Sequence, residues 1–340
     1  MKNRKVMFMS PLQVQTIEEE YVSRPLGENE IFVKLIYSLI SPGTEQAMLA
    51  GTESWAQLPL CPGYASVSRV IEAGKGVKDI EPGDVIFHYG SHCEYQTLEV
   101  RDVVLKVPAG LELRWVPFTR MATVAFTSLR VSNIELGDKV SVTGLGLVGN
   151  LAAQLARLQG ATVIGVDLSK DRLRTARQCF VEYTLEADDS VKEKIMKITD
   201  GRGVSSHIEA TGIPRVGVDS LEYIGSQGEM ILLGSPRGVY QTDVTDVLNY
   251  CHLENRGSIT FKGAHEWRYP VEPDRFVKHS LVRNSLIVFE LMQRQKLQIE
   301  PLISHVIKPE QAAEAYEGLR INKDRYNGVL FDWSAEGETR

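Results

Sequence analysis

The chain has 340 residues, of which 43% are hydrophobic and 24% charged, and its formal net charge is -6. This length predicts two domains, and the composition is that of a globular protein rather than a disordered or fibrous one. Acidic and basic residues are interspersed, which gives no reason to expect a nucleic acid as partner.

Cysteine spacing and hydropathy indicate the cellular location of the protein. The four cysteines lie far apart and form no C-x-x-C pair, so they predict neither a disulfide framework nor a zinc ribbon. No apolar run approaches the roughly 20 residues that span a bilayer. The positively charged segment 2–5 precedes an apolar run that is too short for a signal peptide. We therefore expect a cytoplasmic protein with no membrane partner.

The first hundred residues alternate short apolar runs with turn residues, as at 31–36, 68–71 and 84–87. This alternation predicts a mainly β domain. From about Trp115 the pattern changes to strands separated by helical segments, which predicts a parallel sheet covered on both faces. The expected strands and helices of this second part are strands 139–142, 162–166, 206–209, 230–233 and 258–262, and helices 148–159 and 190–198.

The end of the chain departs from this alternation. Residues 273–298 read as mostly helical, and 326–333 read as a last strand. A strand that ends the chain needs a sheet to join, and the β domain offers one. We therefore expect an α/β fold in which residues 1–118 and 265–340 form a β-rich domain. Residues 119–264 would form a doubly wound, Rossmann-type domain inserted into it.

A glycine-rich turn, Gly144 to Gly149, follows the strand at 139–142. A G-x-G-x-x-G pattern alone is weak, but its place between a strand and a helix is that of a dinucleotide-binding turn. Gly144 permits the tight turn, Gly146 the approach of the pyrophosphate, and Gly149 close packing of helix on strand. The free N–H groups at the start of the helix, from Leu147 and Val148, would face the phosphates.

Asp167 ends the next strand, 18 residues after Gly149. An acid at this spacing accepts hydrogen bonds from the adenine ribose and repels a 2′-phosphate, so NAD is predicted. The alternative is that Asp167 caps the following helix, and Lys170 and Arg172 leave NADP open. The full set of expected cofactor-binding residues is Gly144, Gly146, Leu147, Val148, Gly149, Asp167, Arg172, Thr211 and Gly234.

Taken together, these motifs resemble the medium-chain dehydrogenase/reductase superfamily over essentially the whole chain, which implies a GroES-like β domain beside the Rossmann domain. The segments that carry the resemblance are 82–85, Gly63, 137–140, 144–149, 209–212 and 261–263. A narrower resemblance is to a bacterial branch that includes bacteriochlorophyllide dehydrogenase and sugar or polyol dehydrogenase-like proteins, and it rests on 41–45, 62–67 and 328–333.

The chain departs from the zinc-dependent members of that superfamily. Ser41, Tyr64 and Met121 stand at or near the positions where the resemblance implies zinc ligands. A catalytic zinc needs about three Cys, His or carboxylate donors, which these residues do not supply. The four-cysteine structural zinc lobe of those members is also absent, because residues 87–95 run straight through the region where it would be inserted. We expect no metal.

Without a metal, the proton of the reacting oxygen must be handled by side chains. The candidates are Glu45 as a base, Tyr64 as a donor, Thr44 as a hydroxyl relay, and His92. Glu45 could instead cap a helix, and Tyr64 could be a packing residue. His88 and His92 could suggest a metal clip, but two histidines in a loop are more often solvated. The expected substrate contacts are Trp55, Tyr89, Arg120, His265 and Glu266, with surface or structural roles as alternatives.

These residues predict a zinc-independent, NAD-dependent oxidoreductase that acts on a secondary alcohol, such as a sugar, cyclitol or other polyol. One alternative is an NAD(P)H-dependent quinone or enoyl reductase. Another is a nucleotide-binding redox sensor without catalysis. The resemblance also implies a homodimer that pairs through the edge strand near 257–262.

Overall fold

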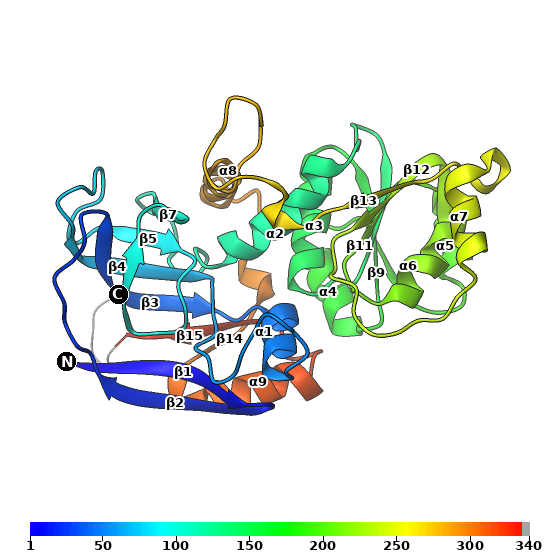
Figure 1. Cartoon of the computed structure of the whole chain (residues 1–340). Helices are drawn as coiled ribbons and strands as arrows, with labels where there is room; N and C mark the ends of the chain where they lie inside the picture. Colours follow the sequence, from blue (N-terminus) through cyan, green and yellow to red (C-terminus); the bar gives the residue numbers. More distant parts are fainter. Residues whose placement is uncertain (335–340) are drawn as a thin grey trace.

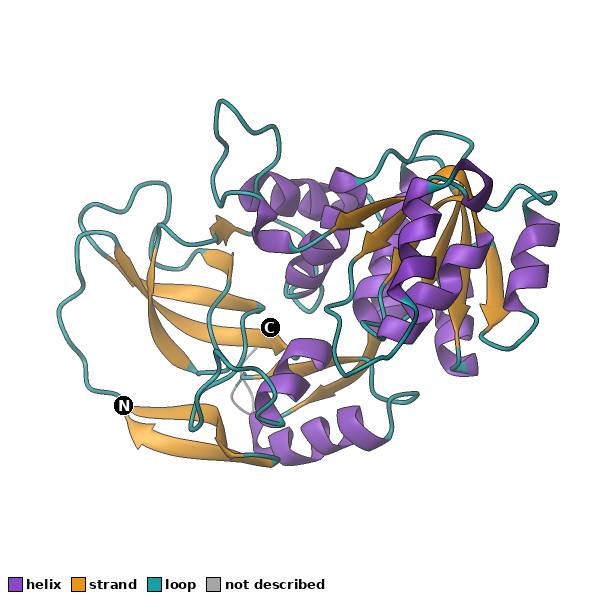
Figure 2. Cartoon of the chain, turned by 45° about the vertical axis from the view of Figure 1, so that its right-hand side comes forward, coloured by secondary structure: helices purple, strands orange, loops and turns teal. Residues whose placement is uncertain are grey.

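The structure is a computed structural model that describes residues 1–334. Two large sheets dominate it, with a separate hairpin at the N-terminus. Figure 1 shows the first sheet with strands from both ends of the chain, in blue, cyan and red, and the second sheet in green and yellow. Helices cover both faces of the second sheet (Figure 2).

The first sheet runs in the order β14-β15-β3-β4-β5-β7, with β6 paired to β3. All its pairs are antiparallel except β14 with β15. The predicted last strand therefore joins this sheet, with Leu330 opposite Leu39. Its strands are β3 (Glu30–Leu39), β4 (Ser66–Ala73), β5 (Val85–His88), β6 (Tyr95–Glu99), β7 (Val104–Lys106), β14 (Ile303–Ile307) and β15 (Gly328–Asp332).

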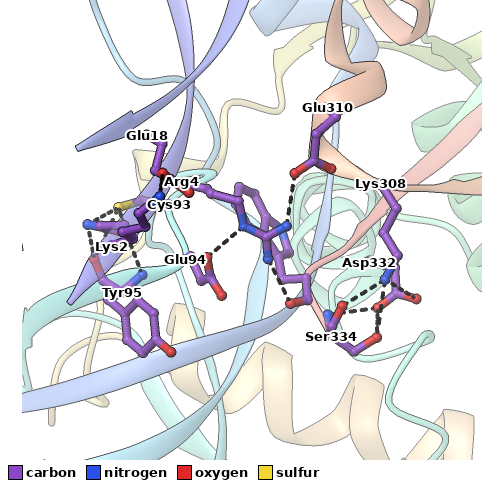
Figure 3. Close-up of polar contacts among 12 residues, drawn as sticks. Lys2, Arg4, Glu18, Cys93, Glu94, Tyr95, Lys308, Glu310, Asp332 and Ser334 are labelled. Carbon is purple, nitrogen blue, oxygen red and sulfur yellow. Dashed lines mark hydrogen bonds and ion pairs between the residues drawn. The ribbon is translucent and has the colours of Figure 1, made fainter. Parts of the chain in front are cut away.

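The N-terminal hairpin, β1 (Lys2–Ser10) and β2 (Gln13–Glu20), is held to this sheet by polar contacts. Arg4 lies between Glu94 and Glu310, with N···O distances of 2.7 and 2.9 Å (Figure 3). Glu94 thus pairs with the hairpin. Two helices complete this part of the molecule, α1 (Pro42–Leu49) and α9 (Ala312–Ile321).

The second sheet has six parallel strands in the order β10-β9-β8-β11-β12-β13. Numbered from its first strand this is 3-2-1-4-5-6, the order of a dinucleotide-binding fold, so the predicted fold class is confirmed. The strands are β8 (Lys139–Thr143), β9 (Thr162–Asp167), β10 (Tyr183–Glu186), β11 (Val204–Glu209), β12 (Ile224–Leu232) and β13 (Thr260–Gly263). Its helices are α3 (Leu147–Leu158), α4 (Lys170–Gln178), α5 (Val191–Ile198), α6 (Pro214–Ser220) and α7 (Val244–His252).

Helix α3 shows why the predicted helix after the glycine turn forms. Its residues are mostly leucine and alanine, which lose little side-chain freedom in a helix. Leu151, Ala152, Leu155 and Ala156 are buried, so an apolar face packs on the sheet. The N-terminus of α3 is thereby fixed at the carboxyl end of β8.

Helices α2 (Phe118–Val131) and α8 (Leu281–Gln293) lie against each other between the two sheets (Figure 1). One hydrophobic core runs from Phe87 of the first sheet, through Phe118 and Phe289 of these helices, to Val140 of the second. The expected domain limits at residues 118 and 265 remain a prediction, because this core crosses both of them.

The expectation of helix over most of 273–298 is only partly correct. Residues 269–280 form a loop, and α8 begins after Ser280, whose hydroxyl accepts a hydrogen bond from the Arg283 N–H. Asp274 contributes to the difference, because its side chain accepts a hydrogen bond from the Phe276 N–H and its backbone forms an isolated bridge with Val277, so a turn replaces the helix there. Among residues 1–334, no helix is long and apolar enough to cross a membrane.

Candidate active site

A cavity of about 820 Å³ lies between the two sheets. This volume is within the range of small-molecule and cofactor sites. Its wall combines the first turn of α1, loops of the first sheet, one face of α2, and the carboxyl ends of the parallel strands. Among its lining residues are Ser41, Thr44, Trp55, Tyr64, Tyr89, Arg120, Met121, Gly146, Leu147, Val148, Gly149, Thr211, Gly234, Arg237, His265, Glu266 and Trp267.

The glycine-rich turn forms one end of this cavity. Gly144 has a φ of +89°, and a Cβ at Gly149 would lie 1.8 Å from the Gly144 carbonyl oxygen, so both positions require glycine. Gly146 is different, because a Cβ there would meet only the Arg172 guanidinium, at 3.8 Å. No side chain caps α3 at Gly146. The first turn of α3 therefore offers backbone N–H groups to an anion in the cavity.

Asp167 lies beside this turn. Its two carboxylate oxygens accept hydrogen bonds from the N–H groups of Leu145, at 2.7 Å, and Ser169, at 2.8 Å. The Arg172 guanidinium is 3.7 Å away. The carboxylate thus contacts the cofactor turn and Ser169, the residue that caps α4 through its own hydroxyl. The helix cap is therefore Ser169 rather than Asp167, and the ribose contact of Asp167 stays a prediction.

Gly234 and Thr211 close the same end of the cavity. A Cβ at Gly234 would lie 2.3 Å from the N–H nitrogen of Gly212, so two loops that follow β11 and β12 approach each other closely. Thr211 is held by Glu209, whose carboxylate accepts hydrogen bonds from its N–H and its hydroxyl. We call the turn 144–149, with Thr211 and Gly234 beside it, the glycine cradle. It fits a dinucleotide, because there is space at Gly146 and close packing at the surrounding glycines.

Tyr64 lies at the other end of the cavity with the hydroxyls of Ser41 and Thr44. Its position depends on Gly63, which has a φ of +101° and where a Cβ would lie 2.7 Å from His92. Burial raises the pKa of the Tyr64 phenol, and Glu45 raises it further. Ser41, Thr44 and Arg120 oppose this rise. Tyr64 is therefore a protonated donor at neutral pH.

Glu45 and His92 do not line the cavity, contrary to the expectation that they handle the proton directly. Both are fully buried. Glu45 accepts hydrogen bonds from the Ser41 N–H, at 2.9 Å, and from Tyr316, and lies 3.1 Å from His92. The other ring nitrogen of His92 is 2.7 Å from Ser38. Glu45 thus links the start of α1, which carries Ser41 and Thr44, to α9.

His88 is also buried rather than solvated, which corrects the expectation for the histidine pair. Its Nδ1 accepts a hydrogen bond from the Gly90 N–H, at 2.9 Å, and its Nε2 is 2.7 Å from Ser68. Burial lowers the pKa of His88 to about 3, so the ring is neutral. His88 and His92 have separate hydrogen-bond partners and do not form a pair.

A buried ion pair joins Arg120 of α2 to Glu266, which follows β13. The other oxygen of Glu266 accepts hydrogen bonds from Tyr89 and Thr123, each at 3.1 Å. The Arg120 guanidinium lies over two aromatic rings, 4.4 Å from the centroid of Tyr89 and 4.9 Å from that of Tyr64. Arg120 therefore joins the Tyr64 end of the cavity to the segment after β13.

The remaining expected substrate contacts lie around the same cavity. Trp55 is 64% exposed and His265 is also exposed. The Trp55 indole donates to Glu53, at 3.1 Å, and Glu53 accepts hydrogen bonds from Arg237 of the opposite wall, at 2.5 and 3.1 Å. An ion pair thus crosses the cavity between the two halves of the molecule.

Three residues that take part in these contacts, Thr123, Glu53 and Arg237, were not predicted from the sequence. Thr123 lies three residues after Arg120 on one face of α2, so helical spacing could have indicated it. Glu53 and Arg237 are separated by 184 residues, and no local pattern pairs them.

The donor set of the cavity does not fit a catalytic zinc. Ser41, Tyr64 and Met121 come together in its wall, as the resemblance implies. A hydroxyl, a phenol and a thioether do not replace the thiolate, imidazole or carboxylate ligands of zinc. Within residues 1–334 no group of three or more His, Cys, Asp or Glu side chains could hold a metal ion.

The chain is similar in sequence to known dehydrogenases. Residues 148–272 match the family described as zinc-binding dehydrogenase. The chain is 25% identical to an L-threonine 3-dehydrogenase of Pyrococcus furiosus, over 94% of this chain and 95% of that protein. It is 26% identical to a sorbitol dehydrogenase of Halalkalibacterium halodurans, over 62% of this chain and 71% of that protein.

Solved structures share the fold across nearly the whole chain. Galactitol-1-phosphate dehydrogenase of Escherichia coli has a TM-score of 0.83 at 19% identity and covers 97% of this chain and 99% of its own. A zinc-binding dehydrogenase of Sinorhizobium meliloti bound to NADP has a TM-score of 0.79 at 21% identity, with 98% and 99% covered. A short chain alcohol dehydrogenase of Escherichia coli complexed with NADH has a TM-score of 0.81 at 14% identity, with 97% and 99% covered.

The parallel sheet, the glycine cradle and the cavity that faces a second sheet define an oxidoreductase that uses a nicotinamide cofactor. The sequence and fold comparisons together support the medium-chain dehydrogenase/reductase superfamily for this chain.

Proposed function

We propose that the protein is a zinc-independent, NAD-dependent dehydrogenase that interconverts a secondary alcohol, such as a polyol, and its ketone. The observation that carries this proposal is the position of Tyr64. Its hydroxyl lies with those of Ser41 and Thr44 in the cavity that also holds the glycine cradle. A proton donor and a dinucleotide site therefore share one cavity.

The chain's own residues would bind the cofactor at the cradle. Gly146, Leu147 and Val148 offer the N–H groups of the first turn of α3 to the pyrophosphate, and Thr211 borders the same space. The bound nicotinamide supplies the acceptor or donor of a hydride. The expected roles of Asp167, Arg172 and Gly234 in cofactor binding remain part of this proposal.

Tyr64 would hold the proton at its phenolic oxygen. Because its pKa is raised, the phenol stays protonated and can donate to the oxygen of a ketone. Arg120 stabilises the phenolate that remains, and so do the two neighbouring hydroxyls. Glu45 acts as a positioning residue, because it holds the turn that carries Ser41 and Thr44.

A polyol is favoured because the cavity offers several hydroxyl and charged groups. Arg120 and Glu266 form a pair of complementary charges at the cavity wall, and Tyr89 and Thr123 fix its geometry. Arg120 can donate a hydrogen bond to one hydroxyl of the substrate, and Glu266 can accept one from the adjacent hydroxyl.

Activity on a panel of secondary alcohols and polyols tests this proposal, with NAD reduction followed by absorbance and metal content measured by elemental analysis. We expect at least one polyol to be oxidised, and we expect a chelator to leave that rate unchanged. One zinc ion per chain, together with a loss of activity on chelation, would contradict zinc independence. Reduction of quinones or enones without any alcohol oxidation would contradict the reaction class.

Replacement of Asp167 by asparagine tests the preference for NAD. The wild-type protein should bind NADH more tightly than NADPH, and Asp167→Asn should narrow this preference about tenfold, equivalent to about 1.4 kcal/mol of removed repulsion. Fluorescence titration with each cofactor measures the ratio. Asp171→Asn is a matched control, because Asp171 is partly exposed and pairs with Arg174. Equal ratios in the wild-type protein and Asp167→Asn would contradict the assignment.

We also propose that the protein is a homodimer that pairs through β13. This strand is at the edge of its sheet, and exposed apolar residues lie on it and on α7: Phe261 is 39% exposed, Val244 61% and Leu248 58%. An unpaired edge next to apolar surface favours association. Light scattering should give the mass of two 38.0 kDa chains, and Phe261→Glu should lower it toward one. A monomeric wild-type protein would contradict this proposal.

A further inference from the structure

Two arginines lie together at the end of α2 that is opposite the cavity. Arg130 is in the last turn of α2, and Arg283 is in the first turn of α8, which packs against α2. Ten residues of helix, about 15 Å, separate Arg130 from Arg120 of the cavity wall. This pair therefore lies outside the site described above.

Arg130 is held in one position. Its Nε donates to the side-chain oxygen of Asn284, at 3.1 Å, and its guanidinium lies over the ring of Phe126, 4.1 Å from the centroid. The terminal nitrogens of Arg130 have no partner among residues 1–334. A fixed guanidinium with free donors is a preorganised anion ligand.

No carboxylate balances the charge of this pair within the described part of the chain. The Arg283 guanidinium donates to His279, at 3.3 Å, and the neighbouring Lys278 adds a further cation. Burial and Arg283 together lower the pKa of Arg130 to about 10, and Tyr269 opposes this shift. Burial and these three cations together hold the pKa of His279 at about 4. The first turn of α8 contains no acidic residue, although a helix N-terminus favours negative charge.

A second, independent feature is a buried donor without a partner. Asn284 is fully buried, and its side-chain nitrogen makes no hydrogen bond although its oxygen accepts one from Arg130. Such an orphaned donor is costly unless a further acceptor is bound. The groups without a hydrogen-bond acceptor near Arg130 and Arg283 are therefore the Asn284 side-chain nitrogen, which is a donor, and the terminal nitrogens of the Arg130 cation.

We propose that Arg130, Arg283 and Asn284 form a binding site for a phosphate group, either as the free ion or as a phosphomonoester. Two guanidinium groups can each donate two hydrogen bonds to a tetrahedral anion. The neutral His279 accepts from Arg283 through Nδ1, which leaves its Nε2–H as a further donor. The site is independent of the function proposed above.

Calorimetric titration of the full chain with inorganic phosphate tests this proposal, at constant ionic strength with chloride as the competing anion. A second titration with glycerol phosphate distinguishes the free ion from a phosphomonoester. We expect saturable binding to the wild-type protein, at least tenfold weaker in Arg130→Gln and in Arg283→Gln. Arg294→Gln is the control, because Arg294 is at the other end of α8 and is paired with Glu290. NADH affinity should be equal in all four proteins.

Thermal unfolding separates this role from a structural one. Without phosphate, Arg283→Gln should raise the Tm, because it removes a cation that faces another cation and a helix N-terminus. With phosphate, the wild-type Tm should rise and that of Arg283→Gln should not. The proposal is overturned by equal phosphate binding in all variants or by no binding at all. It is also overturned if Arg283→Gln dissociates a dimer, which would show that acidic residues of a second copy cover these arginines.

Discussion

Replacement of Tyr64 by phenylalanine should lower kcat for ketone reduction by about 10²- to 10⁴-fold, the usual contribution of a general acid. The substitution removes only the hydroxyl and keeps the ring beneath Arg120. The affinity for NADH should therefore not change. Stopped-flow or steady-state absorbance on the substrate found in the alcohol panel measures the rate.

The pH profile makes this prediction specific to the proton. Because burial and Glu45 raise the pKa of Tyr64 above its ordinary value near 10, the active, protonated form persists through neutral pH. The wild-type reduction rate should stay constant there and fall only as the pH rises through this raised pKa. The Tyr64→Phe variant should not show this decrease of the rate at high pH.

The control for this experiment is Tyr326→Phe, because Tyr326 stacks on His305 and does not line the cavity. It should keep wild-type activity. Full activity of Tyr64→Phe would show that another group carries the proton, and Thr44 would then be the next residue to test.

A methyl group at Gly146 should weaken NADH binding about 10- to 100-fold, since it separates the phosphates from backbone donors whose hydrogen bonds to charged groups contribute about 1.5–3 kcal/mol each. The fold should tolerate Gly146→Ala. Its φ of -60° suits alanine, and the new Cβ would meet only the Arg172 guanidinium, at 3.8 Å. Fluorescence titration gives the Kd, and thermal unfolding confirms that stability is retained.

Gly263→Ala is the matched control, because a Cβ there has nothing within 4 Å and Gly263 does not line the cavity. Its NADH affinity should equal that of the wild-type protein. If Gly146→Ala also bound NADH normally, the cofactor would have to lie elsewhere than on this turn.

The cofactor end of the cavity could be predicted from the sequence because its determinants are local. The glycine spacing, the strand before it and Asp167 all lie within one βαβ unit of about 30 residues. Steric limits act on neighbouring backbone atoms there, as the 1.8 Å approach of a Cβ at Gly149 to Gly144 shows. All the residues that determine the conformation of the cofactor turn therefore lie in one short segment.

The other end of the cavity could be predicted only in part. Tyr64 and Thr44 line the cavity, but the sequence does not show which way Glu45 faces on its helix. That is decided by Tyr316, 271 residues later in the chain. The partner of Arg120 is likewise 146 residues away. Contacts of this kind depend on how the two ends of the chain return to one sheet.

The continuous core through α2 and α8 has a consequence for motion and for unfolding. Domains that move freely usually meet at small, polar interfaces, whereas here apolar packing extends from Phe87 to Val140 without a break. The two halves should therefore unfold together in one cooperative transition. Any opening of the cavity would then occur by small sliding of α2 against α8 rather than by rotation about a flexible hinge.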